Sequence, residues 1–290
     1  MTTSTLFGSF ELKRGDSDKQ KIWGGHKRPN IGTYVTNLQE SLQAVNIPLS
    51  VDGQFGPGTE RALKMFQWCL NSHPYRLCNQ AAVADTRKVV QTMSGRLDQQ
   101  TASELKRWLD QGYSSTGDLV RVSSSSLEHV EIGAGFRVLN HGSVREGDVV
   151  LASEAVDLIK TANTKAGERS VKLVLNQAFR VNGAPVSGAV VTPATRSQHL
   201  IGHAIDCNIV DGDNWNTSRT FAAGNQTTGA DNLISDLKAA GFRWGGDFSN
   251  PDTPHFDKRL DPYGDAYTFK FFFNQRSITN NQPIPIKNVE

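Results

Sequence analysis

Residues 197–206 read SQHLIGHAID, and residues 244–256 read WGGDFSNPDTPHF. Together the two segments supply histidines and aspartates, with enough glycine and proline to hold them in tight turns. Two histidines and one aspartate with an open fourth position are a usual ligand set for a hydrolytic zinc ion. The two segments therefore predict a metal-dependent hydrolase whose remaining residues serve mostly as scaffold and delivery.

The first segment contains two histidines four residues apart, His199 and His203. Zinc proteases that bind metal through this spacing on a helix need a glutamate directly after the first histidine. Here that position is Leu200, and Gly202 would lie inside the helix. The helical zinc motif is therefore excluded, and we expect His203 to be a neighbouring polar residue.

His199 and Asp206 are separated by a turn that leads into a strand. Residues 204–210 alternate as a half-buried strand should, which directs Asp206 away from the core. The core-facing positions would be Ile205, Cys207 and Ile209. His255 could complete a metal site from a second strand, with Pro254 fixing its approach. The alternative is that the histidines are hydrogen-bonded structural residues of their loops.

The two halves of the chain differ in their patterns. Apolar residues recur at helical spacing over 34–45, 59–70 and 101–109, which predicts a small three-helix domain. After residue 126, helical segments at 152–161 and 231–240 mix with strands, without a regular βαβ rhythm. This mixture indicates an α+β domain rather than a doubly wound sheet.

Composition sets the predicted boundaries. Residues 1–30 are polar and predict an N-terminal arm, followed by the helical domain at 31–113. Residues 114–126 are rich in Ser, Thr and Gly, as a linker is. The second domain would span 127–275, and the polar residues 276–290 would form a tail.

The bulk numbers exclude several classes. The net charge of +2 gives no reason to expect nucleic acid, and no apolar run is long enough for membrane insertion. The cysteines Cys69, Cys78 and Cys207 form no disulfide framework or Cys-x-x-Cys site. The first residues lack the apolar core of a signal peptide. We expect a monomer that stays in the cytoplasm until something else releases it.

The first domain resembles the peptidoglycan-binding module of the first type, a compact three-helix domain found on wall-degrading enzymes. The resemblance rests on VDGQFGPGT at residues 51–59, preceded by Leu38-Gln39 and Leu42 and followed by Phe66-Gln67. It departs between residues 71 and 94, where this chain is longer. The resemblance implies bacterial peptidoglycan as a partner.

The second domain resembles the D-alanyl-D-alanine carboxypeptidase family of zinc peptidases, which includes the VanY-like enzymes and the L-alanyl-D-glutamate endopeptidases of phage endolysins. The SxHxxGxAxD pattern at 197–206 and the later WGGD and DxPHF segments carry it. The resemblance implies a mainly antiparallel sheet and a Zn²⁺ ion bound by His199, Asp206 and His255. Asp252 matches the family's catalytic Asp or Glu, and Arg180 falls where the family has an arginine that steadies the substrate and the developing oxyanion.

Three other residues could be confused with these. Arg196 is the rival of Arg180, and its place beside Ser197 favours a structural role. Ser197 would orient a loop or ligand by hydrogen bonding. We expect Asp247 to support the site rather than to act as its base.

Taken together, the two resemblances predict a phage endolysin-like zinc endopeptidase of peptidoglycan that reaches the cell wall through a separate pore. Zinc-activated water would be the nucleophile, with Asp252 as general base and acid. The alternatives are a D-alanyl-D-alanine carboxypeptidase, a wall hydrolase exported against other bacteria, and a non-catalytic wall-binding protein.

Overall fold

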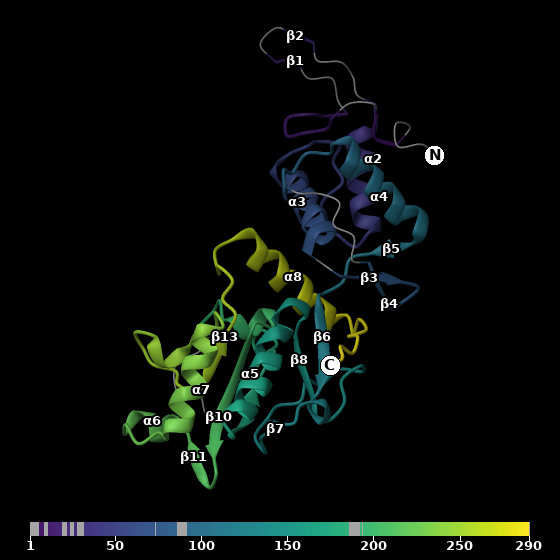
Figure 1. Cartoon of the computed structure of the whole chain (residues 1–290). Helices are drawn as coiled ribbons and strands as arrows, with labels where there is room; N and C mark the ends of the chain where they lie inside the picture. The colour runs from purple at the N-terminus through teal and green to yellow at the C-terminus, as the bar shows by residue number, and fades with distance from the viewer. Residues whose placement is uncertain are drawn as a thin grey trace. The chain divides into compact units, whose positions relative to one another are not determined.

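The computed structural model of the 290-residue chain describes residues 6–8, 11–18, 22–23, 26–27, 32–72, 74–85, 92–185, 192 and 194–289. The chain divides into two compact units, Met1–Gly117 and Asp118–Glu290. Helices and strands occur in both units (Figure 1), and the predicted α+β class is confirmed. In the described part of the chain, every helix is too short or too polar to cross a membrane.

The first unit contains the three predicted helices: α2 (Tyr34–Ala44), α3 (Pro57–Ser72) and α4 (Gln99–Gln111). Two buried glutamines hold the turns that precede α3 and α4. Gln39 accepts from the backbone N–H of Gly53, and Gln67 does the same for Gly95, at 2.9 Å in both cases. Both glycines have a positive φ, so the two turns are built alike. The segments DGQFGPGT at 52–59 and SGRLDQQT at 94–101, which share the glycine and the final threonine, therefore form equivalent turns.

Strands in the first unit were not predicted. Strands β3 (Tyr75–Cys78), β4 (Ala81–Ala84) and β5 (Tyr113–Ser114) form a three-stranded sheet, which accounts for much of the extra length after residue 71. The predicted arm also differs from expectation. It contains the paired strands β1 (Ile22–Trp23) and β2 (His26–Lys27), and Phe7 and Leu12 are buried. Residues 1–5 and most of 19–31 lie outside the described residues.

The second unit is built on a mixed sheet in the order β12-β13-β10-β9-β7, with β11 paired to β10. Every pairing is antiparallel except that between β7 and β9, so the expected mainly antiparallel sheet is confirmed. The strands are β7 (Val130–Ile132), β9 (Lys172–Gln177), β10 (Ala204–Asp211), β11 (Asn214–Asn216), β12 (Arg243–Trp244) and β13 (His255–Asp257). Strand β10 lies at the centre, where the predicted alternation holds: Ile205, Cys207 and Ile209 are buried.

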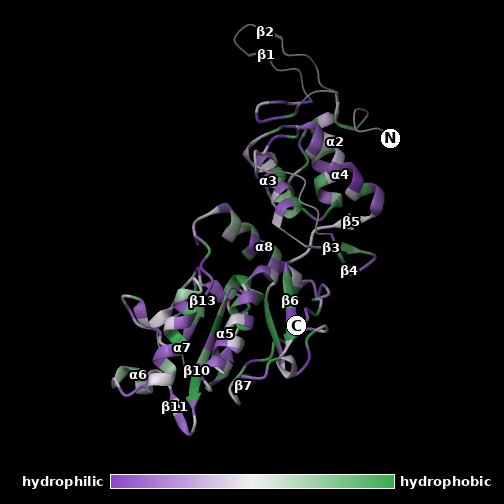
Figure 2. Ribbon diagram, viewed as in Figure 1, coloured by the Kyte–Doolittle hydropathy of each residue, from purple (hydrophilic) through white to green (hydrophobic). Residues whose placement is uncertain are grey.

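Helices cover this sheet and fix its irregular segments. Helix α5 (Val156–Glu168) packs on β9, and α7 (Thr228–Ala239) packs on β10. Strand β10 is coloured mostly green, for apolar residues, in Figure 2. The short helix α6 (Ser218–Ala222) follows β11. Helix α8 (Asp265–Thr279) packs on a 3₁₀ turn, η3 (Gln198–Ile201). Shorter 3₁₀ turns are η1 (Ser124–Ser126), η2 (Ser153–Ala155) and η4 (Gly245–Asp247).

Two segments expected to be linker and tail contribute ordered structure. Within 114–126, Leu119–Ser123 forms β6, which pairs with β8 (Asp148–Ala152). In the expected tail, α8 continues to Thr279 and Ile284 is buried. The high serine content of this segment led to the prediction of a linker. It also contains Leu-Val-Arg-Val at 119–122, and the three apolar side chains of this run are enough to form a buried strand.

Candidate metal centre

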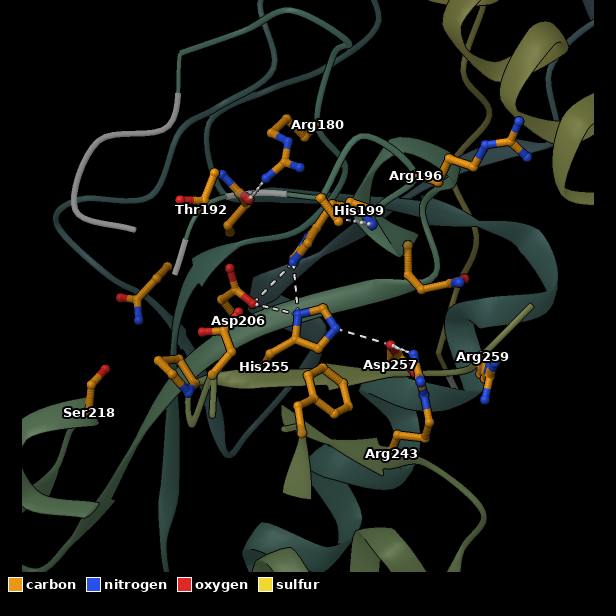
Figure 3. Close-up of a pocket in the computed structure, with 18 of the residues that line it drawn as sticks. Arg180, Thr192, Arg196, His199, Asp206, Ser218, Arg243, His255, Asp257 and Arg259 are labelled. Carbon is orange, nitrogen blue, oxygen red and sulfur yellow. Dashed lines mark hydrogen bonds and ion pairs between the residues drawn. The ribbon is translucent and has the colours of Figure 1, made fainter. Parts of the chain in front are cut away.

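Three side chains from separate elements meet at one point in the second unit. His199 lies in η3, Asp206 in β10 and His255 in β13. Asp206 and His255 are directly opposite each other in the antiparallel register. His199 Nε2 and His255 Nδ1 are 3.1 Å apart, and each lies 3.0 Å from Asp206 Oδ1 (Figure 3). The structure therefore brings together the three residues that the sequence indicated as metal ligands.

His199 is held by the two ends of its turn. Ser197 caps η3 by accepting from the His199 N–H, as expected for a residue that orients this loop. Gly202 ends the turn with φ of 77°, and a Cβ there would lie 2.6 Å from the backbone nitrogen of Ala152. Only glycine fits this close approach without a shift of backbone.

Helix α8 supports the same turn from outside. Tyr267 donates its hydroxyl proton to the Ser197 carbonyl, 3.0 Å away. Asn274 and Gln275 donate their amide protons to the carbonyls of Ile201 and Leu200. These bonds satisfy backbone groups that a short turn leaves unpaired, so the histidine sits on a rigid support.

The partners of each imidazole fix which nitrogen carries the proton. His199 Nδ1 lies 2.7 Å from the carbonyl oxygen of Ala178, which can only accept, so Nδ1 donates and Nε2 is bare. His255 Nε2 lies 3.1 Å from a carboxylate oxygen of Asp257, so Nε2 donates and Nδ1 is bare. In the neutral imidazoles, both bare nitrogens face Asp206.

The sequence analysis missed Asp257, which is fully buried behind His255. Its carboxylate also accepts two hydrogen bonds from Arg243, one from Nε to Oδ1 at 2.8 Å and one from Nη2 to Oδ2 at 2.5 Å. Arg243 stands opposite Asp257 in the β12–β13 register. Metal-binding histidines commonly donate their second N–H to such a carboxylate, which fixes the ring and raises its basicity. Alternation along a strand puts Asp257 on the same face as His255, a signal that could have revealed it.

The donor set fits a divalent metal ion. Two nitrogen lone pairs and one carboxylate oxygen converge at 3.0–3.1 Å, so a cation is needed to relieve their repulsion. Ligands of tetrahedral zinc are separated by roughly 3.3 Å, close to this spacing. The two imidazoles are buried, while the Asp206 side chain is 24% exposed, which leaves one side of the cluster open.

A proton competes with a metal ion for the position between these three side chains. Burial disfavours the charged imidazolium of His255, but the hydrogen bonds and negative charges of Asp206 and Asp257 outweigh it and raise the pKa of His255 to about 9. Burial likewise opposes the charge of Asp206, but the two histidines hold the pKa of that carboxyl well below its usual range. A metal ion that binds here must therefore displace a proton.

Asp252 is held in a tight loop beside this cluster. Its N–H donates to the Gly245 carbonyl, and its own carbonyl accepts from the His255 N–H. A Cβ on Gly245 would lie 2.1 Å from the Asp252 carbonyl oxygen, which explains the glycine. The Asp252 carboxylate accepts no hydrogen bond from the described residues. Burial, followed by the negative charge of Asp206, raises its pKa.

The other sequence candidates occupy distinct positions. The half-buried Arg180 is held by Gln177 at 3.1 Å and lines the same pocket as the cluster. Burial lowers its pKa, while the charge of Asp206 opposes that shift. Arg196 also lines the pocket, and it donates to the Pro262 carbonyl.

Two residues that the sequence analysis did not assign as metal ligand or base, His203 and Asp247, stay outside the cluster. His203 Nδ1 lies 2.9 Å from the Lys258 carbonyl oxygen, and its Nε2 lies 3.1 Å from Glu154. Asp247 pairs with Lys238 at 2.6 Å. Neither side chain belongs to the group of three that could hold a metal ion.

The pocket over the cluster has a volume of about 640 Å³. His199, Asp206, His255, Asp252 and Arg180 all line it, so a metal position, a free carboxylate and a guanidinium face one space. This combination is suited to hydrolysis of a bond with a polarised carbonyl.

Family comparisons agree with this geometry. Residues 191–258 match the family described as D-alanyl-D-alanine carboxypeptidase, and residues 32–70 match the peptidoglycan binding domain. No curated protein matches the chain as a relative. Both resemblances drawn from the sequence are confirmed: part of the second unit is similar to the carboxypeptidase family, and part of the first is similar to a peptidoglycan-binding domain. This combination supports a peptidase that acts on peptidoglycan.

Proposed function

We propose that the protein is a zinc-dependent endopeptidase that cleaves peptide bonds of bacterial peptidoglycan, as phage endolysins do. The observation that carries the proposal is the convergence of two imidazole nitrogens and one carboxylate oxygen in an open pocket. The wall-binding module on the same chain favours peptidoglycan as the substrate.

His199, Asp206 and His255 would hold the zinc ion. Bound there, zinc would polarise the scissile carbonyl and make water a better nucleophile near neutral pH. The protein's own contribution is to present the three ligand atoms already aligned, with the outer nitrogen of each imidazole fixed by Ala178 or Asp257.

Asp252 is the proposed general base and acid. Its carboxylate lines the pocket and accepts no hydrogen bond from the described part of the chain, so it is available to a water molecule. It would accept a proton as water oxygen bonds to the carbonyl carbon. It would then deliver that proton to the departing amine as the carbon–nitrogen bond breaks.

Arg180 would stabilise the negative charge that develops on the carbonyl oxygen. Its guanidinium is half-buried, which strengthens its interaction with a charge in the pocket, and Gln177 restrains its orientation. Fixed positive groups aimed at a developing oxyanion are often the largest single contribution to catalysis.

The binding module would act by raising the local concentration of substrate. Tethering turns the second contact with the wall polymer into an intramolecular event, so the active site needs little affinity of its own. As an endolysin, the protein would reach this polymer through a separate pore.

The test uses purified full-length protein on cross-linked sacculi. We expect solubilisation that a chelator abolishes and added zinc restores, with mass spectrometry showing new amino termini inside the stem peptides or bridges. Release of terminal D-alanine without solubilisation would identify a carboxypeptidase instead. Wall binding without any chelator-sensitive product would contradict an enzymatic function.

A further inference from the structure

Strands β13 and β11 lie one after the other along the same side of β10 (Figure 1). Strand β13 pairs with the first three residues of β10, β11 pairs with the last three, and β9 occupies the other side. His255 is opposite Asp206, and Trp215 is opposite Val210. Because Asp206 and Val210 are an even number of residues apart, their side chains and those of their partners project from one face of the sheet. Trp215 therefore lies on the face that carries the metal cluster.

The pocket over the cluster extends along this face towards Trp215. At about 3.3 Å per residue, the step along β10 from one pair to the other places Trp215 roughly 13 Å from His255. Asn208 lies between the two pairs on the same face, and it lines the pocket. As a diagonal neighbour across the β10–β11 ladder, Asn208 is about 7–8 Å from Trp215. Ser218, three residues after the tryptophan, also lines the pocket.

The side chain of Trp215 is 53% exposed on this face. Helices α5 and α7 pack on each other and cover the opposite face of β9 and β10, where Ile205, Cys207 and Ile209 are buried. Single exposed apolar side chains are common on protein surfaces, so exposure by itself indicates no function. The position of this one does, because a large apolar ring stands beside the pocket and on the same face of the sheet.

The backbone that carries the indole ring is fixed. The Thr220 hydroxyl donates to the Trp215 carbonyl at 3.0 Å, and the Asn216 amide donates to the Ile209 carbonyl at 3.1 Å. The Trp215 carbonyl, which could accept from an added strand, is therefore already bonded. A ligand at this position meets the face of the ring rather than an open strand edge.

The groups around the ring suit a sugar. Asn208 and Ser218 offer an amide and a hydroxyl, which can both donate and accept hydrogen bonds. Lys172, opposite Val210 on the β9 side, is paired with Glu131 at 2.5 Å. A pyranose ring has a flat face of C–H groups and a rim of hydroxyl groups. The C–H face would pack on the indole, while the hydroxyl rim would bond to the amide and hydroxyl groups.

We propose that Trp215, Asn208 and Ser218 form a carbohydrate subsite, in which a sugar ring of the glycan strand stacks on the indole while its stem peptide occupies the pocket. This inference rests on the proposed function, since it assumes a stem peptide at the metal position. About four extended residues span roughly 13 Å, so the sugar end of such a peptide reaches the tryptophan. The protein then prefers stem peptides that are attached to glycan over free peptides.

Binding is measured by calorimetry on zinc-loaded, full-length protein carrying Asp252→Asn, which blocks turnover. One probe is a synthetic stem peptide with N-acetylmuramic acid on its amino terminus, and the other is the same peptide with only the lactyl group. Adding Trp215→Ala should weaken binding of the muramyl peptide about tenfold, the loss expected when roughly 50 Å² of apolar surface stays in water. Binding of the lactyl peptide should not change. Trp215→Phe keeps an aromatic face and should keep most of the affinity.

Tyr263→Ala is the matched control. Tyr263 is also an exposed aromatic residue and follows the pocket residue Pro262, but it does not line the pocket. Binding of both peptides should be unchanged in this variant. Any sugar binding by the first unit is common to all variants, so it cancels when they are compared.

Three results would overturn the inference: an equal loss for both peptides in Trp215→Ala, no loss for the muramyl peptide, or binding of neither peptide. Lysis of sacculi by protein with Asp252 intact tests the proposed function separately. Lysis together with unchanged muramyl binding in Trp215→Ala would reject the subsite and leave the proposed function standing.

Discussion

Replacing Asp257 with asparagine removes one negative charge behind His255 and keeps the shape of the side chain. The carboxylate is buried. It accepts hydrogen bonds from His255 Nε2 and from Nε and Nη2 of Arg243. An asparagine oxygen can still accept from the imidazole, but its NH₂ group would face either the guanidinium or the imidazole N–H as donor against donor. We expect zinc affinity to fall about 10- to 100-fold, the usual effect of losing such a partner.

The assay is competition for zinc against a chromophoric chelator, paired with urea unfolding of the zinc-free protein. A tenfold weaker affinity reduces the stabilisation by saturating zinc by about 1.4 kcal/mol. Unfolding of the zinc-free protein measures any loss of structural stability by itself, because stabilisation by bound zinc is absent there. Asp247→Asn is the control, since Asp247 is an exposed aspartate paired with Lys238 outside the pocket. Unchanged zinc affinity in Asp257→Asn would refute the role given to this residue.

Three further results are expected. Asp252→Asn should lower the rate of wall lysis by about 10²- to 10⁴-fold while zinc content, measured by atomic absorption, stays the same; normal lysis would exclude the residue as base. Gly245→Ala places a methyl group 2.1 Å from the Asp252 carbonyl oxygen, so urea unfolding should show a loss of about 1–3 kcal/mol together with slower lysis. A hydrogen bond to His203 lowers the pKa of Glu154 from 4.5 to about 2. That carboxylate contributes stability that is fully present above pH 4.5 and disappears as the pH falls towards 2. Glu154→Gln should therefore flatten the acid dependence of the unfolding free energy in this window, and an unchanged slope would contradict the assignment.

The parts of the site that could be predicted from the sequence depend on local patterns. The alternation over 204–210 places Asp206 on the side of β10 away from the buried Ile205, Cys207 and Ile209. The turn ending at Gly202 places His199 just before the start of the same strand. Both expectations depend only on residues that are close together in the sequence, through strand periodicity and turn-forming residues, and both agree with the structure.

The parts that could not be predicted depend on contacts between distant segments. Arg243 reaches Asp257 only because β12 pairs with β13, and no pattern within either two- or three-residue strand announces that pairing. Strand β6 was hidden for the same reason, since its partner β8 begins 25 residues after β6 ends. Leu12 likewise becomes core by pairing its backbone with Leu97, far along the chain.

The arrangement behind the ligands explains why the cluster can exist before a metal ion arrives. Three ligand atoms lie 3.0–3.1 Å apart, and they would repel one another without the proton that His255, with a pKa of about 9, carries at neutral pH, so forces acting elsewhere must also hold them. The β10–β13 pairing holds Asp206 and His255, while α8 holds the turn that carries His199. Because the outer nitrogens already donate to Ala178 and Asp257, each imidazole in its neutral form has one lone pair, directed inward. The fold therefore maintains a local excess of negative potential that only a cation relieves, and a divalent ion relieves it more fully than the proton on His255 does.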